Sequence, residues 1–118
     1  YGDDRPYGIS LGNGSLTEIP IQWELHDFPY FAFNYGPAFP IGQGRVSSYD
    51  QVTKNYQREF DGYYQYGLAY VAQFTPQTIG SPGKIRILEE VLQHITQADN
   101  LWIGTCSDLA EVYAQNLD

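Results

Sequence analysis

The segment from Phe60 to Glu90 constrains the fold most strongly, because four signals for regular structure follow one another within it. A helical pattern ends at Gly67, a residue type that commonly terminates helices. Leu68 to Phe74 is an apolar and aromatic run that predicts a buried strand. Ser81-Pro82 then combines an N-cap residue with a proline at a first helical position. Helix, strand, loop and helix in this order predict an α/β fold.

The loop of this segment is the first place to look for chemistry. In α/β folds, functional residues usually lie on loops after the carboxyl ends of strands. Here that loop is Thr75 to Gly80, directly after the predicted strand.

Periodicity predicts the remaining elements on either side of this segment. Val52, Tyr56, Phe60 and Tyr64 are spaced four apart, as on one face of a helix, and are expected in the core. The predicted elements are a strand at Thr17–Trp23, a helix from Ser47 or Ser48 to about Tyr66, a helix over Pro82–Gln97, a short strand at Leu101–Gly104 and a helix from about Ser107. His94 is expected at the edge of the core.

A long aromatic stretch separates the first strand from the first helix. Phe28 to Gly44 is rich in proline, glycine and aromatic residues and is predicted to be an irregular loop. Its rings are either a stacking platform for a sugar or a surface that packs on a partner chain. They are Tyr30, Phe31, Phe33, Tyr35 and Phe39.

Composition excludes several classes of function. The formal net charge is −8 and the six basic residues form no cluster, so nucleic acid is not an expected partner. No apolar run approaches the roughly 20 residues of a membrane span, and no membrane partner is expected. The single cysteine, Cys106, excludes an internal disulfide and is expected to pack as a small apolar residue. Asn13-Gly14-Ser15 fits the acceptor pattern for glycosylation, and its use would imply secretion.

Strands that alternate with helices predict a parallel sheet covered on both faces. Three strands make a very small sheet of this kind, and the 118 residues form a single segment without a linker. We therefore expect the chain to be the C-terminal part of a larger α/β domain, either processed or encoded as a separate subunit.

Five motifs, in order along the chain, resemble the C-terminal half of polysaccharide deacetylases of the NodB-homology type. The branch that contains peptidoglycan deacetylase-like, allantoinase-like and cyclic imide hydrolase-like proteins is the most similar. The motifs are Asp3-Asp4-Arg5-Pro6-Tyr7, Glu18 to Trp23, Asp27 to Phe31, Glu59 to Gly62, and Pro76 to Ile85.

The resemblance implies a deformed (β/α) barrel that hydrolyses amides with a metal, usually zinc. In the family, an aspartate and two histidines in the N-terminal half hold the metal. This chain would therefore close the barrel and supply pocket walls, with the N-terminal part as its partner and an amide or N-acetylated carbohydrate as substrate. His26 and His94 lie on different elements, so no metal ligands are assigned to this chain.

The chain departs from the family at Thr75. The resemblance implies a histidine at this position, which acts as the general acid toward the leaving nitrogen. A threonine hydroxyl can donate a hydrogen bond, but it does not titrate near neutral pH. His26 is the candidate substitute, with a surface histidine as the alternative.

Three further residues are candidates for the pocket. Trp23 and Asp27 either line and orient it or are a core tryptophan and a turn aspartate. Arg5 either binds a substrate carbonyl or carboxylate through its guanidinium or pairs with Asp3 or Asp4. The sequence therefore predicts catalytic roles for Asp27, Thr75 and His26, and substrate contacts for Arg5, Trp23, Tyr30 and Phe31.

Two other functions remain open. Because of Thr75, the chain can be a non-catalytic relative that keeps an aromatic pocket for binding a carbohydrate or another ligand. It can also be a free-standing small α/β or lectin-like domain. Such a domain would have to be stable without the additional strands of a larger sheet.

Overall fold

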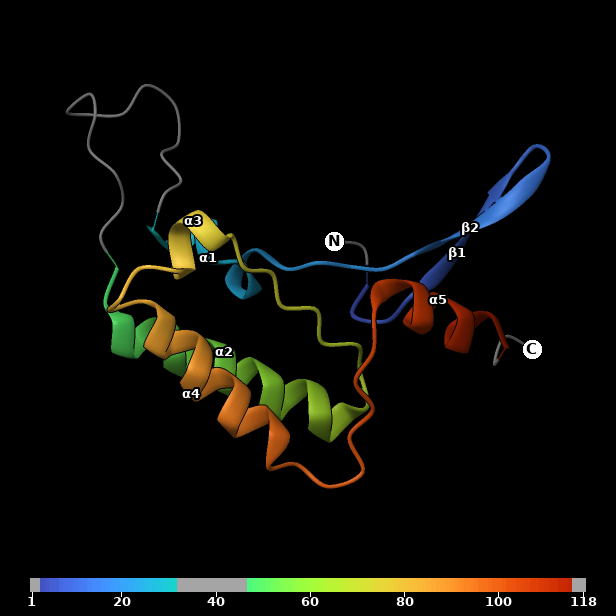
Figure 1. Ribbon diagram of the computed structural model, residues 1–118. Coiled ribbons are helices and arrows are strands. Elements are labelled where there is room, and N and C mark those ends of the chain that lie inside the picture. Colours follow the sequence, from blue (N-terminus) through green and yellow to red (C-terminus); the bar gives the residue numbers. More distant parts are fainter. Residues whose placement is uncertain (1–2, 32–46, 116–118) are drawn as a thin grey trace, which may run out of the picture.

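A computed structural model describes residues 3–31 and 47–115. Figure 1 shows a two-stranded hairpin, a pair of long helices and a set of short helical turns joined by extended segments. The elements in chain order are β1 (Tyr7–Leu11), β2 (Gly14–Glu18), the 3-10 helix η1 (Trp23–Leu25), α1 (Asp27–Phe31), α2 (Tyr49–Tyr66), α3 (Pro76–Ile79), α4 (Ile85–Thr96) and α5 (Cys106–Gln115).

The hairpin β1–β2 differs from the sequence prediction. The two strands are antiparallel, and Leu11 pairs with Gly14 across a turn at residues 12–13. The predicted strand at Thr17–Trp23 is wrong beyond Glu18, because Pro20 cannot donate to a ladder and Trp23 already begins η1. The acceptor pattern at Asn13 lies in the exposed turn.

Helix α2 confirms the prediction, including both of its ends. The Ser48 side chain accepts a hydrogen bond from the backbone of Gln51, and Gly67 ends the helix in the left-handed conformation at φ 65°. Tyr56 and Phe60 are buried as expected, whereas Tyr64 is exposed. The buried tyrosine of the last turn is Tyr63. A helix has 3.6 residues per turn, so residues spaced exactly four apart gradually leave the buried face, and by Tyr64 the spacing has done so.

Helix α4 lies alongside α2, and the core forms between them (Figure 1). It begins at Ile85, three residues after the predicted start, because Ser81 caps a preceding turn by accepting from the Lys84 N–H. Leu92, although apolar, is exposed. The buried core consists of Leu25, Phe31, Val52, Tyr56, Ile79, Ile87 and Val91.

The predicted parallel sheet is not present among the described residues. Residues 68–74 are extended, but the segment forms only one parallel bridge, between Gln73 and His26. Residues 101–104 form no strand, and Trp102 and Ile103 are exposed. Both segments have the apolar character of strands, but a strand assignment requires a paired backbone, which the described part of the chain supplies only at Gln73.

The aromatic stretch begins with α1, so the predicted irregular loop is wrong for its first residues. Residues 32–46 of this stretch lie outside the described residues. Helix α5 is confirmed, and Thr105 and Asp108 cap it reciprocally through their side chains and backbone N–H groups. Cys106, its first residue, is exposed rather than packed. None of the described helices combines the length and apolar character needed to cross a membrane.

Candidate functional site

The centre of the candidate site is the carboxylate of Asp27, which is 0% exposed. The backbone N–H of Thr75 donates to both of its oxygens, at 2.9 Å and 2.8 Å. Asp27 is the first residue of α1, and Thr75 immediately precedes α3. Two of the three predicted catalytic residues, 48 positions apart in the chain, therefore meet directly.

A short parallel pairing of extended chain brings these two residues together. The N–H of Gln73 donates to the Leu25 carbonyl at 2.7 Å, and the N–H of Asp27 donates to the Gln73 carbonyl at 3.3 Å. Both segments therefore end at the same level, with Asp27 and Thr75 just beyond the pairing. This is the position at which α/β folds place their functional residues.

His26 completes the predicted trio. Its Nε2 lies 3.8 Å from Oδ1 of Asp27, and its side chain is 29% exposed. The imidazole therefore joins a fully buried carboxylate to the surface. The role of His26 as a substitute for the general acid stays a prediction.

The wall behind the trio includes Tyr56, which sequence reasoning placed only in the core. Its ring stacks on Phe74 at a centroid distance of 5.1 Å, and its hydroxyl donates a long hydrogen bond of 3.5 Å to the Gln73 carbonyl. Burial raises the pKa of Tyr56, and the negative charge of Asp27 raises it further. Tyr56 thus stays a neutral donor that contacts the two residues before Thr75. The sequence signal for it was its spacing of four residues from Val52 and Phe60 on one helix face.

Tyr30 and Phe31 do not form an exposed stacking platform. Phe31 is buried in the core, and Lys84 Nζ lies 5.4 Å from its ring centroid. Tyr30 is half-buried, and its hydroxyl donates to the Glu24 carbonyl at 2.7 Å. Burial raises the pKa of Tyr30. The other three rings of the predicted platform, Phe33, Tyr35 and Phe39, lie outside the described residues.

Trp23 lies in η1 and is 53% exposed, so it is not a core tryptophan. The Trp23 carbonyl accepts a hydrogen bond from the His26 N–H at 3.3 Å, so Trp23 lies one turn before His26. A substrate contact by its indole remains a prediction.

Arg5 lies at the opposite end of the extended segment from Thr75. The carbonyl of its neighbour Asp4 accepts the Ala69 N–H, and six extended residues, roughly 20 Å, separate Ala69 from Thr75. The structure therefore does not bring Arg5 to the Asp27 carboxylate. The Arg5 N–H donates to Asp3 Oδ1 at 3.3 Å, and within the described residues no ion pair joins its guanidinium to Asp3 or Asp4.

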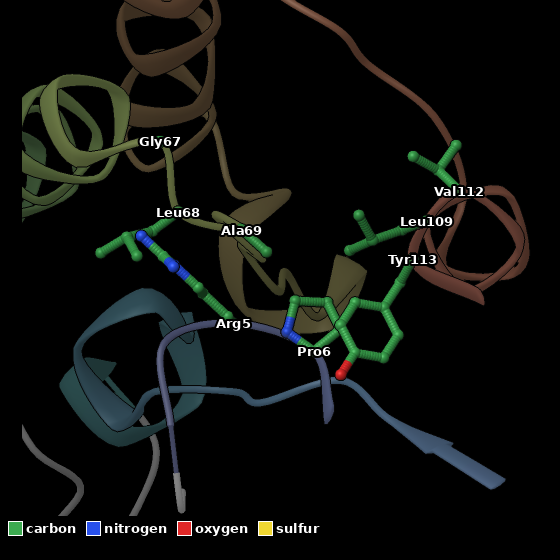
Figure 2. A pocket seen from close by; sticks show the side chains of 8 residues that line it. All are labelled: Arg5, Pro6, Gly67, Leu68, Ala69, Leu109, Val112 and Tyr113. Carbon is green, nitrogen blue, oxygen red and sulfur yellow. The ribbon is translucent and has the colours of Figure 1, made fainter. Parts of the chain in front are cut away.

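Arg5 instead borders a hollow of about 290 Å³. Figure 2 shows Arg5 and Pro6 on one side of it and the side chains of α5 on the other, with Leu68 beside the Arg5 side chain and Ala69 above Arg5 and Pro6. The lining includes Arg5, Pro6, Leu68, Ala69, Leu109 and Tyr113. This hollow is separate from the Asp27 carboxylate.

The described residues do not make a metal site. No group of three or more His, Cys, Asp or Glu side chains that could hold an ion occurs in residues 3–31 and 47–115. His26 and Asp27 offer two donors, fewer than structural or catalytic metal sites in proteins use.

A second histidine–aspartate pair lies elsewhere. His94 Nε2 of α4 is 2.6 Å from Asp61 Oδ1 of α2, and the imidazole contacts the Phe60 ring edge-on. The half-buried position of His94 confirms the expectation of a histidine at the edge of the core. It packs α4 on α2 away from Asp27 and Thr75.

No family model matches the chain. A Schizosaccharomyces pombe protein is 26% identical over 97% of this chain. A crystal structure from Mycobacterium smegmatis is 29% identical over 98% of this chain, with a TM-score of 0.82. Both carry the description "putative polysaccharide deacetylase". The chain spans only 37% and 40% of their lengths and matches the C-terminal part. The resemblance to polysaccharide deacetylases is therefore confirmed.

Proposed function

We propose that this chain is the C-terminal portion of a hydrolase that cleaves C–N amide bonds, with N-acetylated sugars or related amides and imides as substrates. Its 118 residues are a single segment of one domain. An N-terminal part, as the relatives possess, completes a deformed (β/α) barrel with it and holds the divalent metal, for which zinc is our expectation. The chain supplies the pocket wall around Asp27.

The observation that carries this proposal is the contact between Asp27 and Thr75 at the shared end of two extended segments. A carboxylate with 0% exposure is costly unless hydrogen bonds compensate it, and here the Thr75 N–H provides that compensation. The similarity to two proteins described as polysaccharide deacetylases supports a hydrolase of that kind.

Each member of the trio has a proposed role. Asp27 fixes Thr75 and the loop that follows it by accepting the Thr75 N–H on both carboxylate oxygens. The Thr75 hydroxyl donates a hydrogen bond to the substrate carbonyl oxygen. His26 carries the only imidazole of the three and gives a proton to the leaving nitrogen.

The test is release of acetate from N-acetylated chito-oligosaccharides. We expect the 118-residue chain to be inactive alone and active when joined to the N-terminal part of the Mycobacterium smegmatis relative. In the active form, His26→Gln should lower kcat by about 10²-fold or more. His94→Gln, which removes the other histidine–aspartate pair, is the matched control and should leave kcat unchanged. Equal losses in both variants would refute the assignment of His26.

A non-catalytic binding role is the second candidate, and Thr75 is the observation that favours it. It predicts that the joined protein binds N-acetylated oligosaccharides in calorimetry and releases no acetate. Restoring a titratable group with Thr75→His would then create measurable turnover only if the rest of the site is intact. Turnover by the unaltered joined protein would exclude this candidate.

A further inference from the structure

We propose that Lys84 is a positioning residue for the loop that begins at Thr75. Its ammonium group lies on two aromatic rings and fixes the far end of residues 75–84 to α1. The inference rests on the proposed function, because it concerns how the chain holds Thr75. It adds a second anchor to the one that Asp27 already provides.

The residue type at the start of α4 is the first observation. Lys84 occupies the N-cap position of this helix, and its side chain makes no capping hydrogen bond. Serine, threonine, aspartate and asparagine are favoured at an N-cap, and the positive end of the helix dipole disfavours a cation there. The lysine therefore does not stabilise the helix that it precedes. A residue that breaks a local rule in this way is explained by its other contacts.

The Lys84 ammonium group contacts two rings. Its Nζ is 5.4 Å from the ring centroid of Phe31 and 5.9 Å from that of Tyr49. Both distances lie within the roughly 6 Å over which the face of an aromatic ring attracts a cation. The two rings also contact each other edge-on, at a centroid distance of 5.5 Å. Within the described residues, no carboxylate lies at ion-pairing distance from Nζ, so the rings are its electrostatic partners.

The backbone beside Lys84 approaches one of these rings as well. A Cβ atom on Gly83 would lie 3.2 Å from Cε2 of Tyr49, so the chain passes close to the ring because Gly83 has no side chain. The Ser81 hydroxyl accepts the Lys84 N–H at 3.4 Å and fixes the same turn. Side chain and backbone together therefore bring this turn to the ring pair.

The two anchors of the loop lie at opposite ends of α1. Asp27, the first residue of this helix, accepts the Thr75 N–H on both carboxylate oxygens. Phe31, the last residue, lies under the Lys84 ammonium group. Between the anchors, α3 lies against α1 (Figure 1). Residues 75–84 are therefore held at both ends by one short helix, and movement at one end is opposed at the other.

Two other roles for Lys84 fit less well. A lysine that only makes the surface soluble would extend into water, whereas Lys84 is half-buried and lies on the buried ring of Phe31. A lysine that reacts with substrate would face the Asp27 carboxylate. Lys84 instead contacts the other end of α1, so we assign it no contact with reacting atoms.

Amide hydrogen exchange of the 118-residue chain, measured residue by residue with NMR, tests the positioning role. Lys84→Met keeps much of the side-chain length and removes the charge, whereas Lys84→Arg keeps the charge. We expect the Thr75 N–H to exchange about two- to fivefold faster in Lys84→Met, as the loss of one cation–π contact implies. Lys84→Arg should restore the exchange rate of the unaltered chain.

The matched control is Lys54→Met, at the only other lysine of the sequence, which is exposed on α2. It should leave exchange at Thr75 unchanged. The N–H groups of the hairpin β1–β2 are the internal reference and should exchange equally in all variants. An unchanged Thr75 rate in Lys84→Met, no rescue by Lys84→Arg, or equal acceleration in the hairpin would each overturn the proposal.

Activity of the protein joined to the N-terminal part of the Mycobacterium smegmatis relative gives the second measurement. Lys84→Met should lower kcat about two- to fivefold and leave KM unchanged, because Lys84 acts on Thr75 rather than on the substrate. A rise in KM with an unchanged kcat would overturn the positioning role. If the unaltered joined protein releases no acetate, the deacetylase function is rejected, and the exchange rate at Thr75 still decides whether Lys84 anchors the loop.

Discussion

The two histidine–aspartate pairs of this chain have similar components and opposite surroundings. His94 and Asp61 lie closer, at 2.6 Å, but their side chains are 31% and 61% exposed. His26 and Asp27 are 3.8 Å apart, and the carboxylate is 0% exposed. The first pair joins two long helices at their surface, whereas the second closes the end of a short parallel pairing.

The difference shows that a short distance alone does not identify a functional pair. Water screens the Asp61 charge, so its attraction to the imidazole contributes little to stability. The Asp27 carboxylate has exchanged water for the Thr75 N–H, and its electrostatic effect on neighbouring groups is correspondingly stronger. Enclosure, and the elements that create it, distinguish the candidate site.

The enclosure depends first on Leu25, which is buried beside Asp27 and whose carbonyl accepts the Gln73 N–H. We expect Leu25→Ala to lower the free energy of unfolding by about 2–5 kcal/mol, because it leaves a cavity in the core. Urea unfolding measures this change. Leu16→Ala, at an exposed leucine, should stay within about 0.5 kcal/mol of the unaltered chain. A similar loss in both variants would contradict the assigned core.

Removing the buried carboxylate should have the next largest effect. Asp27→Ala is expected to destabilise by about 1–3 kcal/mol, because the Thr75 N–H loses its acceptor. Asp27→Asn keeps an oxygen that can accept this N–H and should cost less. The ranking of the two variants in urea unfolding tests the hydrogen bond itself, and equal losses would show that only volume matters.

The exposed pair should respond weakly. His94→Gln is expected to change stability by less than about 1 kcal/mol, and added salt should reduce the difference further. Thermal unfolding at two salt concentrations is sufficient to measure it. A loss as large as that of Asp27→Ala would remove the distinction between the two pairs.

The smallest expected effect concerns Glu59, a third carboxylate, on α2. Burial raises its pKa above the ordinary value of 4.5, and the nearby charges of Glu24 and Asp4 raise it further. The fold therefore disfavours the ionised form, so this residue's contribution is most favourable below pH 4.5 and is lost as the pH rises through the folded-state pKa. Glu59→Gln should slightly raise stability at pH 7 and leave it unchanged at pH 4, as a pH series of unfolding curves would reveal.

The helices could be predicted from the sequence because their signals are local. Ser48 and Gly67 mark the two ends of α2, and both do so through groups within a few residues. The hairpin is absent from the sequence predictions, although its two-residue turn contains Gly12 and Asn13, a recognised hairpin signal.

For the extended segments, only the apolar character could be predicted, not the pairing. The apolar runs at residues 68–74 and 101–104 predict strands, but pairing depends on residues far away in the sequence or outside the chain. The same limit applies to the site. Asp27, Thr75 and His26 were identifiable one by one, whereas the contact between Asp27 and Thr75 depends on the register of Gln73 against Leu25. No local pattern encodes that register.

Gly67 gives this register a fixed origin. Its left-handed backbone stops α2 at one residue, and the extended chain is counted from there to Thr75. Since the residues of extended chain are counted from the helix end, a helix that ended one residue later would bring Pro76 to the place of Thr75 at the Asp27 carboxylate, and one that ended a residue earlier would bring Phe74 there. Phe74 would bring an aromatic side chain, and Pro76 has no N–H to donate. The residue that reaches the Asp27 carboxylate is thus set by the number of residues that follow Gly67. A single residue inserted between Gly67 and Gln73 would change it without altering any side chain of the site.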